Sequence, residues 1–235
     1  MAAREVIILA GGLGTRLSAT VPGVQKCMAP VNGIPFLYYV INFLLRNNAD
    51  RFIFSVGYMA GNIEQFMAEK FPRLNKIFVT EEKPLGTGGA ILKSLGHAVE
   101  DDVLVLNGDT LFDVDLNSLY LFHSENDADC TIALKPMKNF DRYGTVQLND
   151  DGVVTGFMEK KFMLEGLING GIYLMKRNSF LRQQFPEVFS FEKEYLEKKF
   201  TDQKIFGVVS DGYFIDIGVP EDYFRAQGEL KQIDK

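Results

Sequence analysis

A cluster of glycines between residues 11 and 14 is followed at once by a hydroxyl and a guanidinium group. Glycine lets the backbone turn sharply and come close to a ligand that a Cβ would keep away. Consecutive N–H groups in such a turn form a concave anion site, and the planar cation of Arg16 binds phosphate oxygens at two points. The segment predicts a polyphosphate site, with a tight strand-to-helix turn as the alternative interpretation. The predicted contacts are Leu9, Ala10, Gly11, Gly12, Gly14, Thr15 and Arg16.

Two known phosphate loops do not match this cluster. It lacks the Gly-Lys-Ser/Thr ending of a P-loop, and its spacing differs from the G-x-G-x-x-G of dinucleotide-binding folds. It follows a short apolar run at residues 6–9, whose β-branched side chains suit a buried parallel strand. The pattern favours a phosphate loop of another kind.

Two later turns also carry residues that bind phosphate or metal. Residues 81–90 form a second glycine-rich turn that opens a helix, where N–H groups can meet a phosphate or a base edge. Close packing of that helix on the sheet is the alternative. Asp109 follows an apolar run and a glycine, and Mg²⁺ prefers such hard oxygen ligands, although a lone Asp in a turn more often forms an Asx turn. From the residues alone, Asp109 is the strongest candidate ligand for Mg²⁺, with the Asx turn as the alternative.

Strands and helices alternate around these turns. Apolar runs predict strands at residues 6–9, 51–56, 76–80 and 103–106, and helical spacing predicts helices at 36–47, 62–70 and 86–96. This alternation is typical of a doubly wound sheet, in which ligands bind at the carboxyl ends of the strands.

Beyond residue 125 the pattern changes. We expect strands at 128–134, 144–148, 153–158 and 168–175, a hairpin turn at 149–152, and helices at 177–184, 192–200 and 221–231. The predicted fold is a single α/β domain with a Rossmann-like doubly wound, mostly parallel mixed sheet and helices on both faces. His97 is expected at a helix end and His123 in a surface helix, and neither is given a role.

Composition restricts the class of protein. The 235 residues suffice for one domain with a proper core, and the net charge of -6 argues against a nucleic-acid binder. Cys27 and Cys130 form no C-x-x-C motif, which favours a reducing, cytoplasmic setting. No segment has the length of a membrane span, so we expect a soluble protein without membrane contact.

The glycine cluster, followed by residues 26–31, resembles the signature of the sugar-1-phosphate nucleotidyltransferases, or nucleoside-diphosphate-sugar pyrophosphorylases. In that family a loop ending in Thr-Arg-Leu precedes a Pro-Lys-Pro segment. Gln25 and Cys27 stand here in place of both prolines, which leaves Lys26 less rigidly extended than its family counterpart.

The resemblance extends over nearly the whole chain and implies a set of site residues. It places nucleotide contacts at Lys26, Glu81, Gly86, Thr87, Asn107 and Gly108, in addition to the glycine loop. It places sugar-phosphate contacts at Tyr143, Gly144, Glu159, Lys160 and Asn169, and a second metal-binding carboxylate at Asp216. Residues 1–125 would form the nucleotide-binding half and residues 126–235 the sugar-binding half.

The reaction implied is the in-line attack of a sugar 1-phosphate on the α-phosphorus of a nucleoside triphosphate, with Mg²⁺ as cofactor. The implied catalytic residues are Arg16, Lys26, Asp109 and Asp216, which act through orientation and charge neutralisation. Residues 84–90, 140–146, 166–173 and 214–223 are most similar to the branch that joins GTP to D-glycero-D-manno-heptose 1-phosphate for surface glycans.

Several alternatives stay open. A mannose-1-phosphate guanylyltransferase is the nearest rival, followed by a uridylyl- or thymidylyltransferase of the same fold, because few contacts decide such preferences. A nucleotide-sugar-sensing subunit without turnover is a rival from another class. Homo-oligomerisation is also left open.

Overall fold

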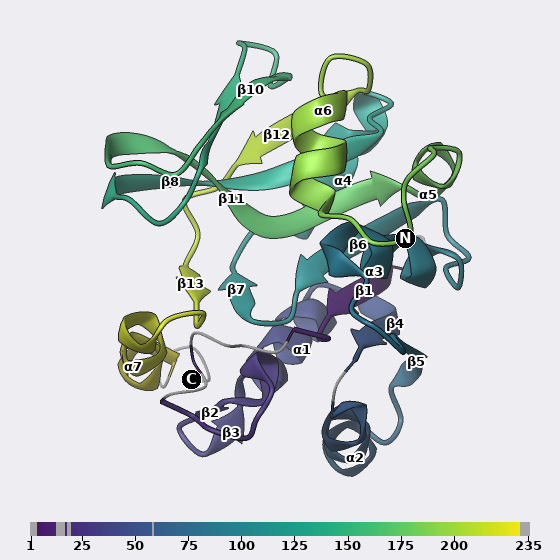
Figure 1. The fold of residues 1–235 in the computed structure, drawn as a ribbon, viewed down its shortest axis with the longest axis vertical. Coiled ribbons are helices and arrows are strands. Elements are labelled where there is room, and N and C mark those ends of the chain that lie inside the picture. The colour runs from purple at the N-terminus through teal and green to yellow at the C-terminus, as the bar shows by residue number, and fades with distance from the viewer. Residues whose placement is uncertain (1–3, 13–16, 18–19, 58, 231–235) are drawn as a thin grey trace.

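The computed structural model describes residues 4–12, 17, 20–57 and 59–230 of the chain. In these residues, nine strands form one mixed sheet with helices on both faces (Figure 1). The strand order is β10-β9-β11-β6-β1-β4-β5, and β8 pairs with β11 and β12. The strands are β1 (Arg4–Leu9), β4 (Ala49–Val56), β5 (Asn75–Thr80), β6 (Asp102–Asn107), β8 (Cys130–Phe140), β9 (Thr145–Leu148), β10 (Val154–Met158), β11 (Met163–Lys176) and β12 (Ile205–Val209).

Strand direction follows the change of pattern seen in the sequence. β1 is parallel to β4 and β6, and β4 is parallel to β5. β11 is antiparallel to β6, β8 and β9, and β10 is antiparallel to β9. Since β12 is parallel to β8, only β10 and β11 run against the other strands of the described sheet. The prediction of a single α/β domain with a mostly parallel mixed sheet is confirmed.

Helices cover the two faces because successive strand residues point in opposite directions. Val6 and Ile8 of β1 belong to the core on one face, and Ile7 belongs to the core on the other. The first core is covered by α1 (Phe36–Arg46), α2 (Ala60–Lys70), α4 (Leu116–Glu125) and α7 (Pro220–Glu229). The second is covered by α3 (Gly86–Leu95), α5 (Arg177–Leu181) and the π-helix η2 (Glu192–Leu196).

Short elements connect the sheet to the site. The 3₁₀ turn η1 (Lys26–Met28) leads into the hairpin of β2 (Pro30–Val31) and β3 (Ile34–Pro35). A second ribbon joins β7 (Thr110–Phe112), which follows β6, to β13 (Phe214–Asp216), which precedes α7. This ribbon brings the C-terminal part of the chain to the carboxyl end of β6.

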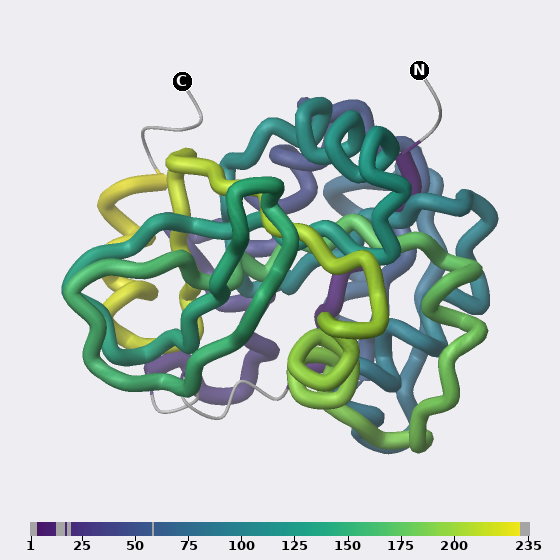
Figure 2. The backbone as a smooth tube through the Cα atoms, turned by 90° about the horizontal axis from the view of Figure 1, so that it is seen from above, coloured from purple at the N-terminus to yellow at the C-terminus, as the bar shows by residue number. Residues whose placement is uncertain are grey.

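The predicted helix at 192–200 differs from expectation in its form. It begins as the π-helix η2 and continues as α6 (Glu197–Lys199). π-Turns are rare and often occur at functional sites. In Figure 2 this lime-green turn lies between the N-terminal strands in purple and blue and the second half of the sheet in teal and green.

Two further expectations can be compared with the structure, and one strand was not expected. The turn at residues 149–152 connects β9 and β10 as predicted, with Gly152 at φ +79°. The strand β12 was not predicted. The placement of His123 on the surface is wrong, because this side chain is 1% exposed, and its Nδ1 lies 2.7 Å from Thr131 Oγ1.

Within the described residues, no helix combines the length and the apolar character that crossing a membrane requires.

Candidate active site

Two cavities meet at the carboxyl end of β6. We call the first the glycine-loop cavity; it has a volume of about 740 Å³. The second, the hairpin cavity, has a volume of about 510 Å³ and lies beside the β9–β10 hairpin. Asn107 and Asp109 line both cavities. The glycine-loop cavity is lined by Leu9, Gly11, Gly12, Ser55, Gly57, Glu81, Glu82, Lys83, Pro84, Gly86, Thr87, Ala90, Asn107 and Asp109.

The first glycine loop forms one wall of the glycine-loop cavity. Leu9, Gly11 and Gly12 line it, whereas Ala10 is buried beneath, where its N–H donates to Ser55 O at 2.8 Å. Gly108 packs close to the same loop, and its N–H donates to Leu9 O at 2.9 Å. The predicted contacts Gly14, Thr15 and Arg16 lie outside the described residues.

Glu81 lies beside the glycine loop, because a Cβ on Gly11 would be 3.0 Å from its Oε1. Its Oε2 accepts from Leu85 N at 2.9 Å, and its Oε1 lies 3.3 Å from Ser55 Oγ. These bonds fix the turn that leads into α3. The carboxylate therefore has a structural function in addition to lining the cavity.

The second glycine-rich turn is packed against a segment about 100 residues further along the chain. Gly86 has φ +72°, and a Cβ there or at Gly88 would overlap Phe189. Phe189 N donates to Leu85 O at 3.0 Å, and Gly88 N donates to Phe189 O at 3.0 Å. A Cβ on Gly89 would lie 2.6 Å from Glu187 O. These glycines are required by the docking of residues 187–191, while Gly86 and Thr87 still line the glycine-loop cavity.

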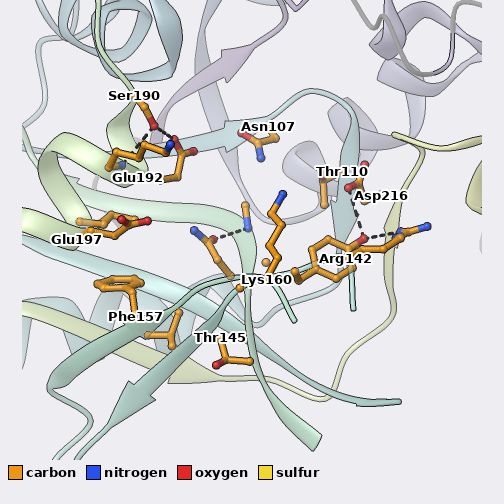
Figure 3. Close-up of a pocket in the computed structure, with 18 of the residues that line it drawn as sticks. Asn107, Thr110, Arg142, Thr145, Phe157, Lys160, Ser190, Glu192, Glu197 and Asp216 are labelled. Carbon is orange, nitrogen blue, oxygen red and sulfur yellow. Dashed lines mark hydrogen bonds between the residues drawn. The ribbon is translucent and has the colours of Figure 1, made fainter. Parts of the chain in front are cut away.

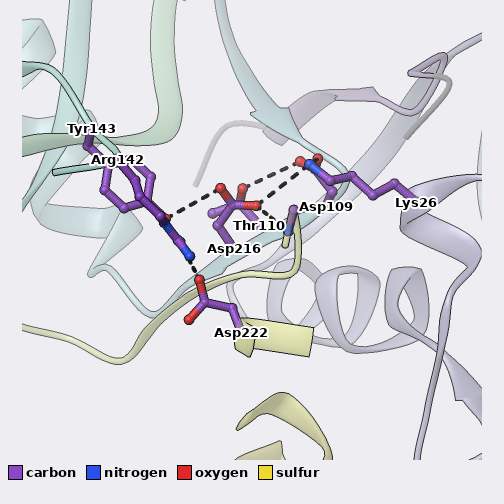
Figure 4. A network of polar contacts seen from close by, with 8 residues as sticks. Lys26, Asp109, Thr110, Arg142, Tyr143, Asp216 and Asp222 are labelled. Carbon is purple, nitrogen blue, oxygen red and sulfur yellow. Dashed lines mark hydrogen bonds and ion pairs between the residues drawn. The ribbon is translucent and has the colours of Figure 1, made fainter. Parts of the chain in front are cut away.

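Asp109 and Asp216 come together through the β7–β13 ribbon (Figure 4). Asp216 pairs with Thr110, and Ile217 N donates to Asp109 O at 3.1 Å. Lys26 Nζ forms an ion pair with Asp109 and lies 3.7 Å from Asp216 Oδ1. Burial, with the Asp109 charge adding to it, raises the pKa of Asp216 above its ordinary value. The site thus concentrates negative charge that further cations would stabilise.

The two departures from the family signature, Gln25 and Cys27, flank Lys26 at the start of η1. Gln25 has φ -64° and ψ 148°, the backbone geometry that a proline would impose. Cys27 is buried in η1, and burial together with the Asp109 charge raises the pKa of its thiol to about 12. The thiol therefore stays protonated, so the Asp109 and Asp216 carboxylates are the candidate ligands for a metal ion here.

The residues present fit a magnesium ion. Among the described residues, no cluster of three or more His, Cys, Asp or Glu side chains has the arrangement of a complete metal cage. Mg²⁺ in nucleotide-dependent enzymes is commonly held by one or two carboxylates and completes its shell with water and substrate phosphates. The Asp109–Asp216 pair provides that number of carboxylates at the junction of the two cavities.

All five residues predicted to contact a sugar phosphate line the hairpin cavity (Figure 3). They are Tyr143, Gly144, Glu159, Lys160 and Asn169. Gly144 is needed because a Cβ there would lie 2.7 Å from Met158 O in the neighbouring strand. Asn169 Nδ2 donates to Tyr173 OH at 2.9 Å, and its Oδ1 accepts from Gly171 N at 2.9 Å.

A chain of polar contacts runs from α7 to the carboxylate pair. Asp222 forms an ion pair with Arg142, whose Nη2 donates to Tyr143 OH at 2.8 Å. The Tyr143 hydroxyl in turn lies 3.5 Å from Asp216 Oδ2. Burial, reinforced by the Asp216 charge, raises the pKa of Tyr143 to about 12. This hydroxyl therefore keeps its proton and donates a hydrogen bond to Asp216.

Several residues that line the hairpin cavity were not predicted from the sequence. Arg142 adjoins Tyr143, which was predicted. The positive charge of Arg142 was the signal that could have identified it as a site residue. The 190–197 segment offered only a charged helical pattern typical of a solvated face. The missed residues include Arg142, Thr145, Phe157, Ser190, Glu192 and Glu197.

Comparisons with known proteins agree with this geometry. The family model for nucleotidyl transferase matches residues 5–233. A D-glycero-alpha-D-manno-heptose 1-phosphate guanylyltransferase of Aneurinibacillus thermoaerophilus is 45% identical over 97% of this chain and 98% of its own length. One of Campylobacter jejuni is 43% identical over 94% and 97%. The crystal structure of HddC from Yersinia pseudotuberculosis complexed with GMP-PN has a TM-score of 0.87 at 33% identity and covers 97% of this chain and 99% of that one.

The fold and the paired carboxylates together form a candidate site for phosphate-containing ligands at the edge of a mixed sheet. The chain belongs to the nucleotidyl transferase family, as its glycine loop and Lys26 segment predicted.

Proposed function

We propose that the protein transfers a guanylyl group from GTP to D-glycero-α-D-manno-heptose 1-phosphate, which yields a GDP-heptose and pyrophosphate. The observation that carries this proposal is the Asp109–Asp216 pair at the junction of two cavities. The choice of base and sugar is supported by the two heptose 1-phosphate guanylyltransferases that are 45% and 43% identical over nearly the whole chain.

In the proposed reaction an oxygen of the sugar phosphate forms a bond to the α-phosphorus of GTP. The bond between that phosphorus and the oxygen bridging to the β-phosphate breaks, and pyrophosphate leaves. No covalent enzyme intermediate is needed. The protein contributes by orienting two anions and by offsetting their mutual repulsion.

We assign the residues accordingly. GTP occupies the glycine-loop cavity, with Arg16 and the amides of the loop around its β- and γ-phosphates, and Lys26 beside the α-phosphate. The sugar phosphate occupies the hairpin cavity near Lys160. Asp109 and Asp216 hold Mg²⁺, which when bound neutralises phosphate charge and orients the reacting oxygens.

We also propose that the two halves of the chain bind different substrates. The glycine-loop cavity is lined by residues between 9 and 109, and most of the residues lining the hairpin cavity lie beyond residue 140. This distribution supports a nucleotide-binding half at about 1–125 and a sugar-binding half at about 126–235.

The test is a matrix of the four nucleoside triphosphates against several sugar 1-phosphates with Mg²⁺, read as pyrophosphate release. We expect the highest kcat/KM with GTP and the heptose 1-phosphate. Higher kcat/KM with mannose 1-phosphate or with another nucleotide would reassign the substrate. Binding of a nucleotide sugar without turnover in any combination would indicate a sensing subunit, whose function does not require two metal-binding carboxylates.

A further inference from the structure

The hairpin cavity has two ends of different character. Lys26 lies with the carboxylate pair, and Arg142, Glu192, Glu197 and Phe157 line the same cavity. In Figure 3, Asp216 and Arg142 lie to one side of Lys160, and Glu192, Glu197 and Phe157 lie to the other. A sugar whose phosphate is bound at the first end would extend its hydroxyls towards the second.

Glu192 is held in a defined orientation at the second end. Its Oε2 accepts from Thr87 Oγ1 at 2.8 Å and from Ser190 Oγ at 2.7 Å. Both bonds fall on the same oxygen, and Oε1 accepts no hydrogen bond from any described residue. Because Glu192 lines the cavity, this fixed carboxylate can accept a hydrogen bond from a ligand there.

The support for Glu192 comes from the docked segment. Phe191 N donates to Thr87 Oγ1 at 2.9 Å, so the Thr87 hydroxyl is fixed by the same backbone that carries Glu192. The packing of Phe189 against the glycines of the 86–89 turn holds this segment in place. Glu192 is also the first residue of η2, and the π-turn begins where the chain enters the cavity wall.

Neighbouring groups complete a polar wall. Tyr173 is buried beside Glu192 and accepts from Asn169 Nδ2 at 2.9 Å. Burial, with the Glu192 charge adding to it, raises the pKa of the Tyr173 hydroxyl well above its ordinary value. That hydroxyl therefore remains a donor, and a fixed donor next to a fixed acceptor matches the needs of sugar hydroxyls.

We infer that Glu192 is a specificity-determining residue, which accepts hydrogen bonds from the hydroxyls of the sugar part most distant from the phosphate. A heptose has one more hydroxyl-bearing carbon there than a hexose. The inference rests on the proposed function, because it assumes that the sugar phosphate binds in the hairpin cavity.

The variant that tests this role is Glu192→Gln. Thr87 and Ser190 both present donors, so the amide oxygen would take the place of Oε2 and the NH₂ group would face the cavity. The charged acceptor is thereby replaced by a neutral donor of nearly the same shape. Hydrogen bonds to charged groups contribute enough for a change on the order of tenfold to hundredfold.

The matched control is Glu194→Gln. Glu194 belongs to the same π-helix but pairs with Lys198 at 2.7 Å and does not line the cavity. The Glu194→Gln variant loses the same charge from the same helix. Any effect of altered helix stability on activity would therefore also be seen in this variant.

The experiment measures kcat and KM for GTP, heptose 1-phosphate and mannose 1-phosphate in the wild type and both variants. In Glu192→Gln we expect KM for heptose 1-phosphate to rise about tenfold or more, KM for GTP to stay within twofold, and the preference for heptose over mannose to fall. Glu194→Gln should match the wild type. An unchanged preference in a folded Glu192→Gln variant would overturn the inference, and so would equal losses in both variants. A wild type that uses neither sugar phosphate would instead contradict the proposed function.

Discussion

Asp216 lies directly opposite Thr110 in the β7–β13 ribbon, which places its carboxylate beside that of Asp109. Two residues more than 100 positions apart thus share one ammonium group, Lys26. Neither carboxylate is part of the hydrophobic core, so each can be changed without removing packed volume.

We therefore predict that Asp109→Asn and Asp216→Asn lower kcat on the order of 10²–10³-fold with little change in the unfolding midpoint. Asparagine keeps the shape but loses the charge that Mg²⁺ requires. Pyrophosphate release at increasing Mg²⁺ measures the loss, and thermal unfolding followed by circular dichroism checks the fold. Near-normal Mg²⁺-dependent activity in the double variant would falsify the metal assignment.

Arg142 and Arg225 provide a matched pair, because both contact Asp222. Arg142 also donates to Tyr143 OH, whereas Arg225 lies 3.4 Å from Asp222 and does not itself line the hairpin cavity. We expect Arg142→Ala to lower kcat/KM for the sugar phosphate about tenfold through a misplaced Tyr143. Arg225→Ala should remain within about twofold, since exposed ion pairs contribute little. Equal effects of the two substitutions would show that Asp222, not Tyr143, is the group that matters.

The second glycine-rich turn predicts a rescue experiment. Gly88→Ala would drive a methyl group into the Phe189 ring, and overpacking of this kind costs about 1–3 kcal/mol. We expect lower stability and a raised KM for both substrates. Adding Phe189→Ala should restore part of the activity because it removes the obstructing ring.

The control for that experiment is Gly61→Ala in α2. A Cβ at Gly61 meets nothing within 4 Å, and alanine favours a helix over glycine. Its unfolding midpoint should equal or exceed that of the wild type. If Gly88→Ala behaved like Gly61→Ala, the docking of residues 187–191 on this turn would be disproved.

The acid stability of the fold should depend on Asp127. Lys176 and Lys204 bond to this exposed carboxylate and lower its pKa from 3.8 to about 2. A lowered pKa in the folded state contributes stability that is present above the unfolded value and is lost as the pH falls towards the folded value.

Asp127→Asn tests this because asparagine also tolerates the φ of +45° at this position. The difference in unfolding free energy between wild type and variant should be constant above pH 5 and shrink between about pH 4 and pH 2. High salt should reduce the difference, as screening weakens exposed pairs. A difference that does not vary with pH would exclude the ion pairs as its source.

The elements that were predicted correctly from the sequence are those whose signals come from neighbouring residues. The strand before the first glycine loop, the hairpin turn ending at Gly152 and the helix opened by Pro220 were predicted because each depends on neighbouring residues. The carboxylate pair was predicted from motifs that the family shares.

Packing between residues far apart in the sequence could not be predicted in this way. The glycines at 86–89 were visible, but nothing in their own neighbourhood identifies Phe189 as the residue they accommodate. Glu192 was therefore predicted only as part of the helix at 192–200, without a role in the site. The burial of His123 had a local signal that was overlooked, since Leu116, Leu119 and His123 follow helical spacing on one face of α4.

The β7–β13 ribbon has a consequence for the synthesis of the protein. Ribosomes deliver the chain from its N-terminus, so the glycine-loop cavity can form while β13 is still untranslated. A nascent chain halted before residue 216 would lack one of the two carboxylates that we propose bind Mg²⁺. Competence for transfer would therefore arise only after β13 has been synthesised and has paired with β7.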